Sequence, residues 1–457
     1  MSALVEQATQ DPGASEKGGK QEKQKNHIQV RSKRLELIQI LTEAVLPFVV
    51  IRLILVLVGV LTIIYIEPLV NVHQPIHLDQ QHMRLPDMLG LMWANFDSGF
   101  YITLAAGGYW GADTLHGMSN WAFYPLYPLL IHVFTLPFAA YPKAGLLAGI
   151  AISNISALVA LVYLYKLTMR EFNRSIAART VLYLMLFPMS FYLSAVYPEA
   201  LFIALVISCI YYARMQRWWL AGFLGGLAAL TRPQGVLMVI VVGWEYWQYL
   251  GDRFAPLETQ GKNIVTTFTN WLSSRILGLW RALSAWRTWL GFTALLQIPF
   301  GLSLFLLYAK WKVGTFFASQ LTERNGWGRT LTNPIHVLKA AFLHPIAPGP
   351  WVWNFYSLNI LVIILFLLAL IPIFRRLPAI YGIFSLLFVL LPLSSGDIGS
   401  IARYYMEVFP VFIWLAWWTS RGSDAQKEVR HSLIVSTFAI LLSFGMVLWA
   451  LGVYAVA

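Results

Sequence analysis

Long, uninterrupted apolar stretches recur along the chain, and residues 353–373 and 431–455 show them most clearly. A helix needs about 20 apolar residues to cross the hydrocarbon core of a bilayer, whereas an outer-membrane strand shows only ~10 residues of alternating polarity. Hydrophobic residues make up 58% of the 457 residues and charged residues only 12%, too few for the surface of a soluble protein. The sequence therefore predicts an all-helical polytopic membrane protein.

The chain is basic, with a formal net charge of +12 and a pI near 9.6. Membrane proteins carry an excess of Lys and Arg in their cytoplasmic loops, so this charge does not indicate a nucleic-acid partner. Cys209 is the single cysteine and lies inside an apolar run, which excludes an intrachain disulfide and a thiolate metal cluster. We therefore expect helix packing to stabilise the fold.

Residues 1–36 predict a disordered cytoplasmic tail, because they are polar and rich in basic residues. The basic residues are Lys17, Lys20, Lys23, Lys25, Arg31, Lys33 and Arg34. The apolar run that follows is too long for a cleavable signal peptide and lacks a small-residue cleavage site. A first span at 40–66 then carries the chain to the outer side.

The stretch 67–143 has the charge pattern of an outer loop, since it holds five acidic residues and only two basic ones, Arg84 and Lys143. It is far longer than a simple connection, and loops of that length are usually functional. Three prolines interrupt its apolar end at 121–138. We predict a juxtamembrane or re-entrant helix there rather than a full span.

Ten further spans bring the predicted total to about eleven, within one transmembrane domain at 37–457. They are placed at 144–168, 177–196, 198–213, 218–231, 234–250, 288–309, 353–373, 378–393, 401–420 and 431–455. This arrangement puts most clusters of basic residues on the cytoplasmic side. The cytoplasmic loop 251–287 combines basic residues with tryptophans, which predicts a helix lying at the membrane interface.

The outer segment 310–350 departs from this charge pattern, because it contains five Lys and Arg residues. Either the span count is wrong by one, or these charges serve a purpose on the outer side. We favour the second interpretation, since a site that handles anionic lipid phosphates needs cationic groups.

Under this topology, unusual polar residues converge on the outer side of the membrane. They are Asp97, Glu199, Arg232, Gln320, Arg329, Asp397 and Arg403. A charged residue at membrane depth costs about 2.5–3.5 kcal/mol on insertion, so such residues indicate function. The alternative for Glu199, Arg232 and Arg403 is that they pair with one another and lock helices together.

Motifs of several other enzyme classes do not occur in the sequence, which has no Gly-rich phosphate loop, HExxH helix or GxSxG turn. His73, His77 and His82 make only a weak case for a metal site, because their spacing falls in an irregular loop. No cofactor is therefore predicted, and the participation of a divalent metal stays open. Gly222 and Gly226 fit a small-xxx-small helix contact.

Several ordered motifs give the membrane part of the chain a resemblance to one enzyme family. They are Phe96–Tyr101 (FDSGFY), Ala105–Tyr109 (AAGGY), Phe123–Pro128 (FYPLYP), Tyr197–Phe202 (YPEALF), Thr231–Gly235 (TRPQG), and Gln320 followed by Trp327–Arg329 (WGR). At these residues the chain resembles the glycosylphosphatidylinositol mannosyltransferase II family and its prokaryotic relatives, members of the C-type glycosyltransferase superfamily. The family usually has Trp where this chain has Phe96, and Phe where it has Tyr124.

The resemblance implies transfer of a sugar, typically mannose, from a polyprenyl-phosphate donor to a lipid or glycan hydroxyl, with inversion at the anomeric carbon. It also implies a C-type bundle in the membrane, and the similarity to prokaryotic members points to a bacterial cytoplasmic membrane with the N-terminus inside. A phosphate leaving group needs no general acid, so one carboxylate acting as base suffices. Asp97 is the expected base.

Cationic groups are expected near the donor phosphate, where negative charge builds as the bond breaks. The residues expected to bind the donor or substrate are Arg232, Arg329, Arg403, Gln320, Tyr101 and Tyr109. Glu199 is expected either to orient the acceptor or to pair with an arginine. Which sugar and which acceptor are used, and whether the chain forms oligomers, is not decided by these residues.

Two other classes of function are compatible with a charged cluster among helices. A transporter or flippase usually shows internal repeats and a site near the membrane midplane, and neither feature is visible in the sequence. A non-catalytic assembly subunit would be favoured by loss of the residue at position 97, where the chain keeps its aspartate. The glycosyltransferase interpretation is therefore preferred.

Overall fold

The computed structural model describes residues 34–70, 85–138, 140–257, 264–343 and 356–453. Within these ranges the chain forms helices joined by turns and contains no strand. The prediction of an all-helical protein is therefore confirmed. The predicted tail 1–36 lies almost wholly outside the described residues, as do His73, His77 and His82.

The longer helices belong to the membrane part of the chain. They are α2 (Leu46–Leu61), α7 (Ala144–Glu171), α8 (Arg174–Leu186), α9 (Glu199–Arg214), α10 (Trp218–Thr231), α11 (Met238–Phe254), α12 (Ile264–Ala282), α13 (Trp286–Val313), α16 (Tyr356–Arg376), α17 (Ala379–Leu393) and α20 (Asp424–Ala450). Shorter helices include α3 (Glu67–Val70), α4 (Leu85–Leu91), α5 (Ser98–Gly107), α6 (Leu126–Thr135), α14 (Ala318–Trp327), α15 (Pro334–Leu343), α18 (Ile401–Tyr405) and α19 (Pro410–Thr419).

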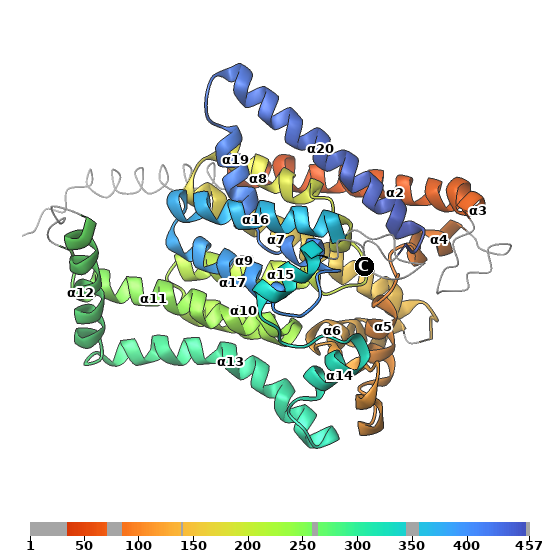
Figure 1. The fold of residues 1–457 in the computed structure, drawn as a ribbon, viewed down its shortest axis with the longest axis horizontal. Helices are drawn as coiled ribbons and strands as arrows, with labels where there is room; N and C mark the ends of the chain where they lie inside the picture. Colours follow the sequence, from red (N-terminus) through yellow and green to blue (C-terminus); the bar gives the residue numbers. More distant parts are fainter. Residues whose placement is uncertain (1–33, 71–84, 139, 258–263, 344–355, 454–457) are drawn as a thin grey trace, which may run out of the picture.

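The helices share one main direction, which sets two ends of the molecule apart. Figure 1 shows α7, α9, α10, α11 and α13 running side by side, and contacts join α7 to α9, α9 to α10, and α10 to α13. At one end α12 stands across this direction against α11, whereas α5, α6 and α14 gather at the opposite end. Each cluster of polar side chains can therefore be assigned to one end of the helix bundle or to the other.

Five of the helices are long and apolar enough to cross a bilayer by themselves. They are Arg34–Leu69, Ala144–Glu171, Trp286–Val313, Asn359–Arg376 and Asp424–Ala450. Several predicted spans correspond to shorter apolar helices, among them α10 and α17. The protein is thus a multi-pass membrane protein, while the count of about eleven spans stays a prediction.

Two predicted spans are broken in the structure. The span at 177–196 ends as a helix at Leu186, just before Pro188, and the chain then runs through a short 3-10 turn, η7 (Ser190–Leu193). The span at 401–420 is divided into α18 and α19, with Pro410 starting the second helix. Proline cannot donate to the helical ladder, so it explains each interruption. Hydropathy alone does not detect such breaks.

The predicted juxtamembrane and interfacial segments are helical. The apolar end of the first outer loop forms α6, whose 10 residues are too few to cross a bilayer. The loop 251–287 contains α12, which exposes apolar side chains such as Phe268 and Trp280. Its position across the end of the bundle fits the predicted interfacial helix (Figure 1).

Glycines allow α10 and α13 to pack with their backbones close together. A Cβ atom on Gly226 would lie 2.6 Å from the carbonyl oxygen of Gln297, and one on Gly222 would meet the carbonyl of Ala294. Gly301 of α13 faces the backbone of Gly226 in the same way. The predicted small-xxx-small contact is confirmed. At this contact the backbones of α10 and α13 approach each other directly, without side chains between them.

Substitution of Gly226 by Ala tests this contact. We expect Gly226→Ala to lower the free energy of unfolding by about 1–3 kcal/mol, because the new methyl group forces the two backbones apart. The matched control is Gly243→Ala on α11, where an added Cβ meets nothing within 4 Å. Thermal unfolding of the purified protein in detergent gives the comparison; equal melting temperatures for the two variants would contradict the close contact.

Candidate functional site

The turn before α5 holds Asp97 in a fixed position. Phe96 has a φ of 53°, in the left-handed region that residues other than glycine rarely adopt, and Asp97 follows as the N-cap of α5. The Asp97 backbone N–H donates to the Tyr197 hydroxyl at 3.0 Å. The Asn95 side chain donates to the Trp449 carbonyl at 2.7 Å. Two distant parts of the chain thus secure a strained turn, which is typical of functional sites.

The Asp97 carboxylate contacts a buried arginine while remaining open to solvent. Its Oδ2 lies 3.5 Å from Arg403 Nη1, and the Asp97 side chain is 30% exposed whereas that of Arg403 is 6% exposed. Arg403 belongs to α18, and its guanidinium lies 5.3 Å from the ring centroids of both Tyr192 and Tyr197. This ion pair therefore joins the exposed turn to the interior of the protein.

Glu199 lies deeper, at the start of α9, with its side chain 2% exposed. Its Oε1 is 3.5 Å from Arg403 Nε and 3.1 Å from Arg232 Nη1. Its Oε2 has no hydrogen-bond partner among the described residues. The positive end of the α9 dipole also favours a carboxylate at this position. Glu199 thus links two arginines and keeps one acceptor oxygen unused.

Arg232 is held between two buried carboxylates. It follows the last residue of α10 and precedes Pro233, which ends the helix there. Besides Glu199, its Nη1 forms a short ion pair with Glu407, whose side chain is 2% exposed. The Gln234 amide donates to the other oxygen of Glu407 at 3.5 Å. Both carboxylates therefore have the cationic partner that buried charges require.

Arg329 lies at the outer edge of the same group, just beyond α14. Its Nη1 is 3.5 Å from Glu323 Oε2, and its Nη2 is 4.0 Å from Asp397 Oδ2. The Tyr404 hydroxyl accepts from Arg329 at 3.4 Å and from Arg403 at 3.1 Å. One hydroxyl thus bridges the two arginines. We call the following residues the ion-pair cluster: Asp97, Glu199, Arg232, Glu323, Arg329, Asp397, Arg403, Tyr404 and Glu407.

The charges at the edge of the cluster influence one another. Burial is the largest influence on the pKa of Glu323 and raises it; the Arg329 guanidinium opposes this effect, and the Asp97 carboxylate adds to it. Protonation of Glu323 therefore depends on the charge of Asp97, although the two residues come from segments far apart in the sequence.

The two predicted tyrosines have different surroundings. Tyr101 is buried beside the cluster, with its ring edge-on to Phe123 at 5.0 Å and tilted against Tyr197 at 6.0 Å. Tyr109 lies away from it, stacked on Trp121 at 4.3 Å, and its hydroxyl donates to the Phe123 carbonyl at 2.7 Å. The structure therefore brings Tyr101 near the cluster and holds Tyr109 in an aromatic packing contact.

The remaining site residues show what sequence reasoning found and missed. Gln320 is exposed on α14, and no hydrogen bond or ion pair joins it to the ion-pair cluster within the described ranges. Glu407, Tyr404 and Glu323 belong to the cluster but were not expected there. The sequence could have indicated Glu407, because an acidic residue inside the apolar stretch 401–420 is costly to place in a membrane. The same argument singled out the charged residues that were predicted.

No arrangement of three or more His, Cys, Asp or Glu side chains suited to a metal ion occurs in the part of the chain that the structure describes. The three histidines of the first outer loop fall outside that part. The role of a divalent metal therefore stays open.

Comparison with protein-family models gives a match over residues 42–280 to the family described as Mannosyltransferase (PIG-V). The match covers more than half of the chain. The chain belongs to this mannosyltransferase family. The resemblance inferred from the motifs is thereby confirmed, and with it the prediction of a membrane glycosyltransferase.

Solved structures also resemble this member of the mannosyltransferase family. ArnT from Cupriavidus metallidurans, bound to undecaprenyl phosphate, shares 14% identity with a TM-score of 0.43, over 78% of this chain and 71% of ArnT. The oligosaccharyltransferase of Archaeoglobus fulgidus in its apo form shares 12% identity with a TM-score of 0.44, over 90% of this chain and 56% of the archaeal one. This chain thus spans just over half the length of the archaeal enzyme. No curated protein sequence matches it.

Removal of the Arg232 charge tests the ion-pair cluster. We expect Arg232→Met to lower the free energy of unfolding by about 3–5 kcal/mol, because Glu407 is then buried without its cation. Adding Glu407→Gln to the same chain should recover part of the loss, since the stranded charge disappears. Denaturant unfolding of the purified variants measures both; a double variant no more stable than the single one would show that the two charges are not coupled.

Proposed function

We propose that this mannosyltransferase-family chain transfers mannose, with inversion, from a polyprenyl-phosphate donor to a hydroxyl of a lipid or glycan acceptor on the extracytoplasmic side of the membrane. The observation that carries the proposal is a difference in exposure between the carboxylates of the ion-pair cluster. Glu199 and Glu407 are buried and form ion pairs with Arg232, whereas the carboxylate of Asp97 is partly exposed beside Arg403. An exposed carboxylate next to a buried cation suits a base that works beside a phosphate.

Asp97 is the best-placed carboxylate to act as the general base. Its side chain is 30% exposed and its carboxylate pairs at 3.5 Å with Arg403, so an acceptor hydroxyl can reach it. Glu199 and Glu407 are each 2% exposed and already bound to Arg232. Glu323 and Asp397 lie against Arg329 instead, on the edge of the cluster. The fixed turn at Phe96 gives Asp97 the defined position that proton transfer needs.

The reaction we propose is a single displacement. Asp97 takes the proton of the acceptor hydroxyl while the hydroxyl oxygen forms a bond to the anomeric carbon of the donor sugar. The bond from that carbon to the phosphate oxygen breaks, and the polyprenyl phosphate leaves with the electron pair. One displacement at the anomeric carbon inverts its configuration. A phosphate monoester has a second pKa of about 6, so it departs near neutral pH without a proton from the protein.

Arg403 and Arg329 are the groups we propose to stabilise the departing phosphate. Their ion pairs with carboxylates are loose, at 3.5 to 4.0 Å, and the Tyr404 hydroxyl holds the two guanidinium groups on either side of itself. A phosphate can therefore exchange with these carboxylates as its charge grows. Arg232 is committed to two buried carboxylates, and we propose that it orders Glu199 and Glu407.

The remaining predicted residues are assigned supporting roles in this proposal. Tyr101 supports the site from its buried position beside the ion-pair cluster, and Gln320 presents an exposed amide on α14. The membrane part acts as one domain from residue 37 onward. The contacts of Arg329 with Glu323 and Tyr404 support our proposal that the basic residues after α13 lie on the same side of the membrane as Asp97.

Replacement of the base is the first test of this function. We expect Asp97→Asn to lower mannose transfer from polyprenyl-phosphate-mannose by about two or more orders of magnitude, because the amide keeps the shape of the side chain and cannot accept the proton. Transfer is measured in membranes with equal amounts of folded protein, judged by thermal melting. Full activity of the variant would remove Asp97 from the mechanism, and no transfer by the unmodified protein from any lipid-linked donor would remove the function.

Replacement of Arg329 tests the donor phosphate assignment. We expect Arg329→Gln to raise the KM for the donor and to lower kcat by roughly tenfold or more, because one cation opposite the phosphate is lost. Arg329→Lys should restore part of both. The control is Arg324→Gln, which removes an exposed charge from α14, the helix that ends just before Arg329. If Arg324→Gln impaired transfer as much as Arg329→Gln, the effect would come from general positive charge.

A further inference from the structure

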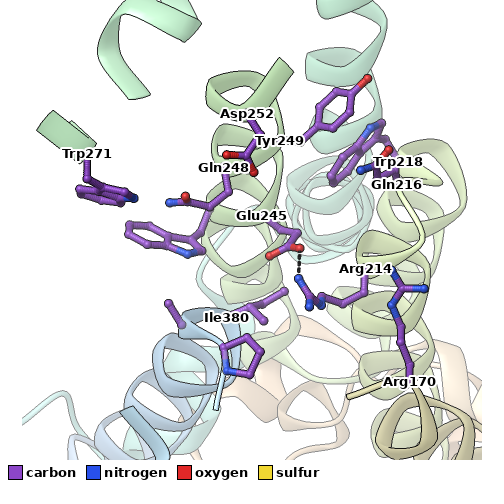
Figure 2. Close-up of a pocket in the computed structure, with 13 residues that line it drawn as sticks. Arg170, Arg214, Gln216, Trp218, Glu245, Gln248, Tyr249, Asp252, Trp271 and Ile380 are labelled. Atoms are coloured by element: carbon purple, nitrogen blue, oxygen red, sulfur yellow. Dashed lines mark hydrogen bonds and ion pairs between the residues drawn. The ribbon is translucent and has the colours of Figure 1, made fainter. Parts of the chain in front are cut away.

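A second polar site lies at the opposite end of the helices from the ion-pair cluster. It is a pocket of about 480 Å³, which is within the range of ~300–1,000 Å³ typical of small-molecule sites. Figure 2 shows its walls, which come from the ends of α7, α9 and α11, the turn between α9 and α10, the start of α17, and α12. Its polar and aromatic lining includes Arg170, Arg214, Trp218, Glu245, Gln248, Tyr249, Asp252 and Trp271.

Helix α9 separates this pocket from the proposed catalytic site. Glu199 is the first residue of α9 and Arg214 is the last. At ~1.5 Å per residue, the two lie about 22 Å apart along the helix. The pocket therefore has no part in the displacement reaction, and its polar side chains need another explanation.

One face of α11 supplies the acidic side of the pocket. Glu245, Gln248, Tyr249 and Asp252 are spaced by three and four residues, which places them on the same face of the helix. The Asp252 side chain is 69% exposed, although it also pairs with Arg275 at 2.6 Å. The Gln248 Nε2 atom is buried and has no hydrogen-bond partner among the described residues. The face thus offers carboxylate acceptors and an unused amide donor.

Two arginines supply the basic side. Arg214 is held by Glu171 at 2.9 Å and by Glu245 at 2.6 Å, and Figure 2 shows the second of these pairs inside the pocket. Arg170 is exposed, and its Nη1 donates to the weak acceptor Met215 Sδ at 3.1 Å. Within the described ranges no carboxylate pairs with Arg170. Its guanidinium is therefore available to an anionic group.

Aromatic rings complete the pocket and indicate its place in the membrane. Trp218 packs against Tyr249 with ring centroids 5.4 Å apart, and Trp244 packs against Trp271 of α12 at 5.9 Å. Tryptophan and tyrosine concentrate where hydrocarbon meets headgroups. Aromatic faces beside carboxylates also favour an ammonium group. In Figure 2, Trp271 and Arg170 lie on opposite sides of the pocket.

We propose that this pocket binds the headgroup of a zwitterionic aminophospholipid, phosphatidylethanolamine, from the leaflet opposite the catalytic site. The phosphate pairs with Arg170, and the ammonium lies against Asp252 and the rings of Trp218 and Tyr249. The Gln248 amide donates to a headgroup oxygen. Arg170 and Arg214 balance Glu245 and Asp252, so the lining is neutral overall and suits a ligand with one charge of each sign.

The test is a lipid titration of the full-length protein in detergent. Short-chain dihexanoyl phosphatidylethanolamine, phosphatidylcholine and phosphatidylglycerol are added separately, and tryptophan fluorescence reports binding. We expect saturable binding of the ethanolamine lipid, roughly tenfold or more tighter than that of the glycerol lipid. Arg170→Gln should weaken it by at least about tenfold, and Asp252→Asn should weaken it while leaving binding of the glycerol lipid unchanged or improved.

Two controls separate this site from other causes. Arg421→Gln removes an exposed arginine outside the pocket and should leave ethanolamine lipid binding unchanged. Asp97→Asn should also leave it unchanged, so failure of the proposed transfer reaction and failure of this site are distinguishable. Equal or tighter binding of the glycerol lipid, no effect of Arg170→Gln, or equally tight binding of soluble phosphoethanolamine would each overturn the assignment to a bilayer aminophospholipid.

Discussion

The pairing of Arg232 with Glu199 and Glu407 is the interaction on which the candidate site depends. These side chains come from the end of α10, the start of α9 and the link between α18 and α19. A charge left alone in this environment is costly, and Arg232 cannot move away without leaving buried Glu407 without its cation. The need to neutralise buried charge therefore brings three separate helix ends to one point.

Arg232, Glu199 and Glu407 form an inner layer of paired charges. This layer supports an outer layer of more exposed residues, which includes Asp97. Arg403 belongs to both layers, because it contacts buried Glu199 and exposed Asp97. Arg329 and Tyr404 extend the outer layer toward α14. The inner layer thus supplies rigidity, while the outer layer supplies the base and the cations that we propose for sugar transfer. With this division, a strongly charged site can exist inside an apolar bundle while some of its charged groups stay accessible to a substrate.

Sequence reasoning predicted much of this arrangement, because hydropathy and charge are local properties. The bounds of α10 follow directly from the apolar run 218–231, and the gathering of Asp97, Glu199, Arg232 and Arg403 follows from topology. The breaks near Pro188 and Pro410 escaped notice, since an apolar sequence looks continuous even where its backbone is not helical. The pairing partner Glu407 was hidden in one of these breaks. Contacts between distant segments, such as the stacking of Tyr109 on Trp121, cannot be read from spacing alone.

The shortness of α9 has a consequence for how substrates reach the protein. Its 16 residues span about 24 Å at ~1.5 Å each, less than the ~30 Å hydrocarbon thickness of a typical bilayer, and polar residues occupy both of its ends. Most of its side chains are covered by neighbouring helices, so these ends are shielded from lipid tails. We therefore expect the candidate catalytic site to lie below the level of the lipid headgroups. The lipid-anchored donor that we propose could then present its phosphate at this depth without lifting its apolar tail out of the membrane.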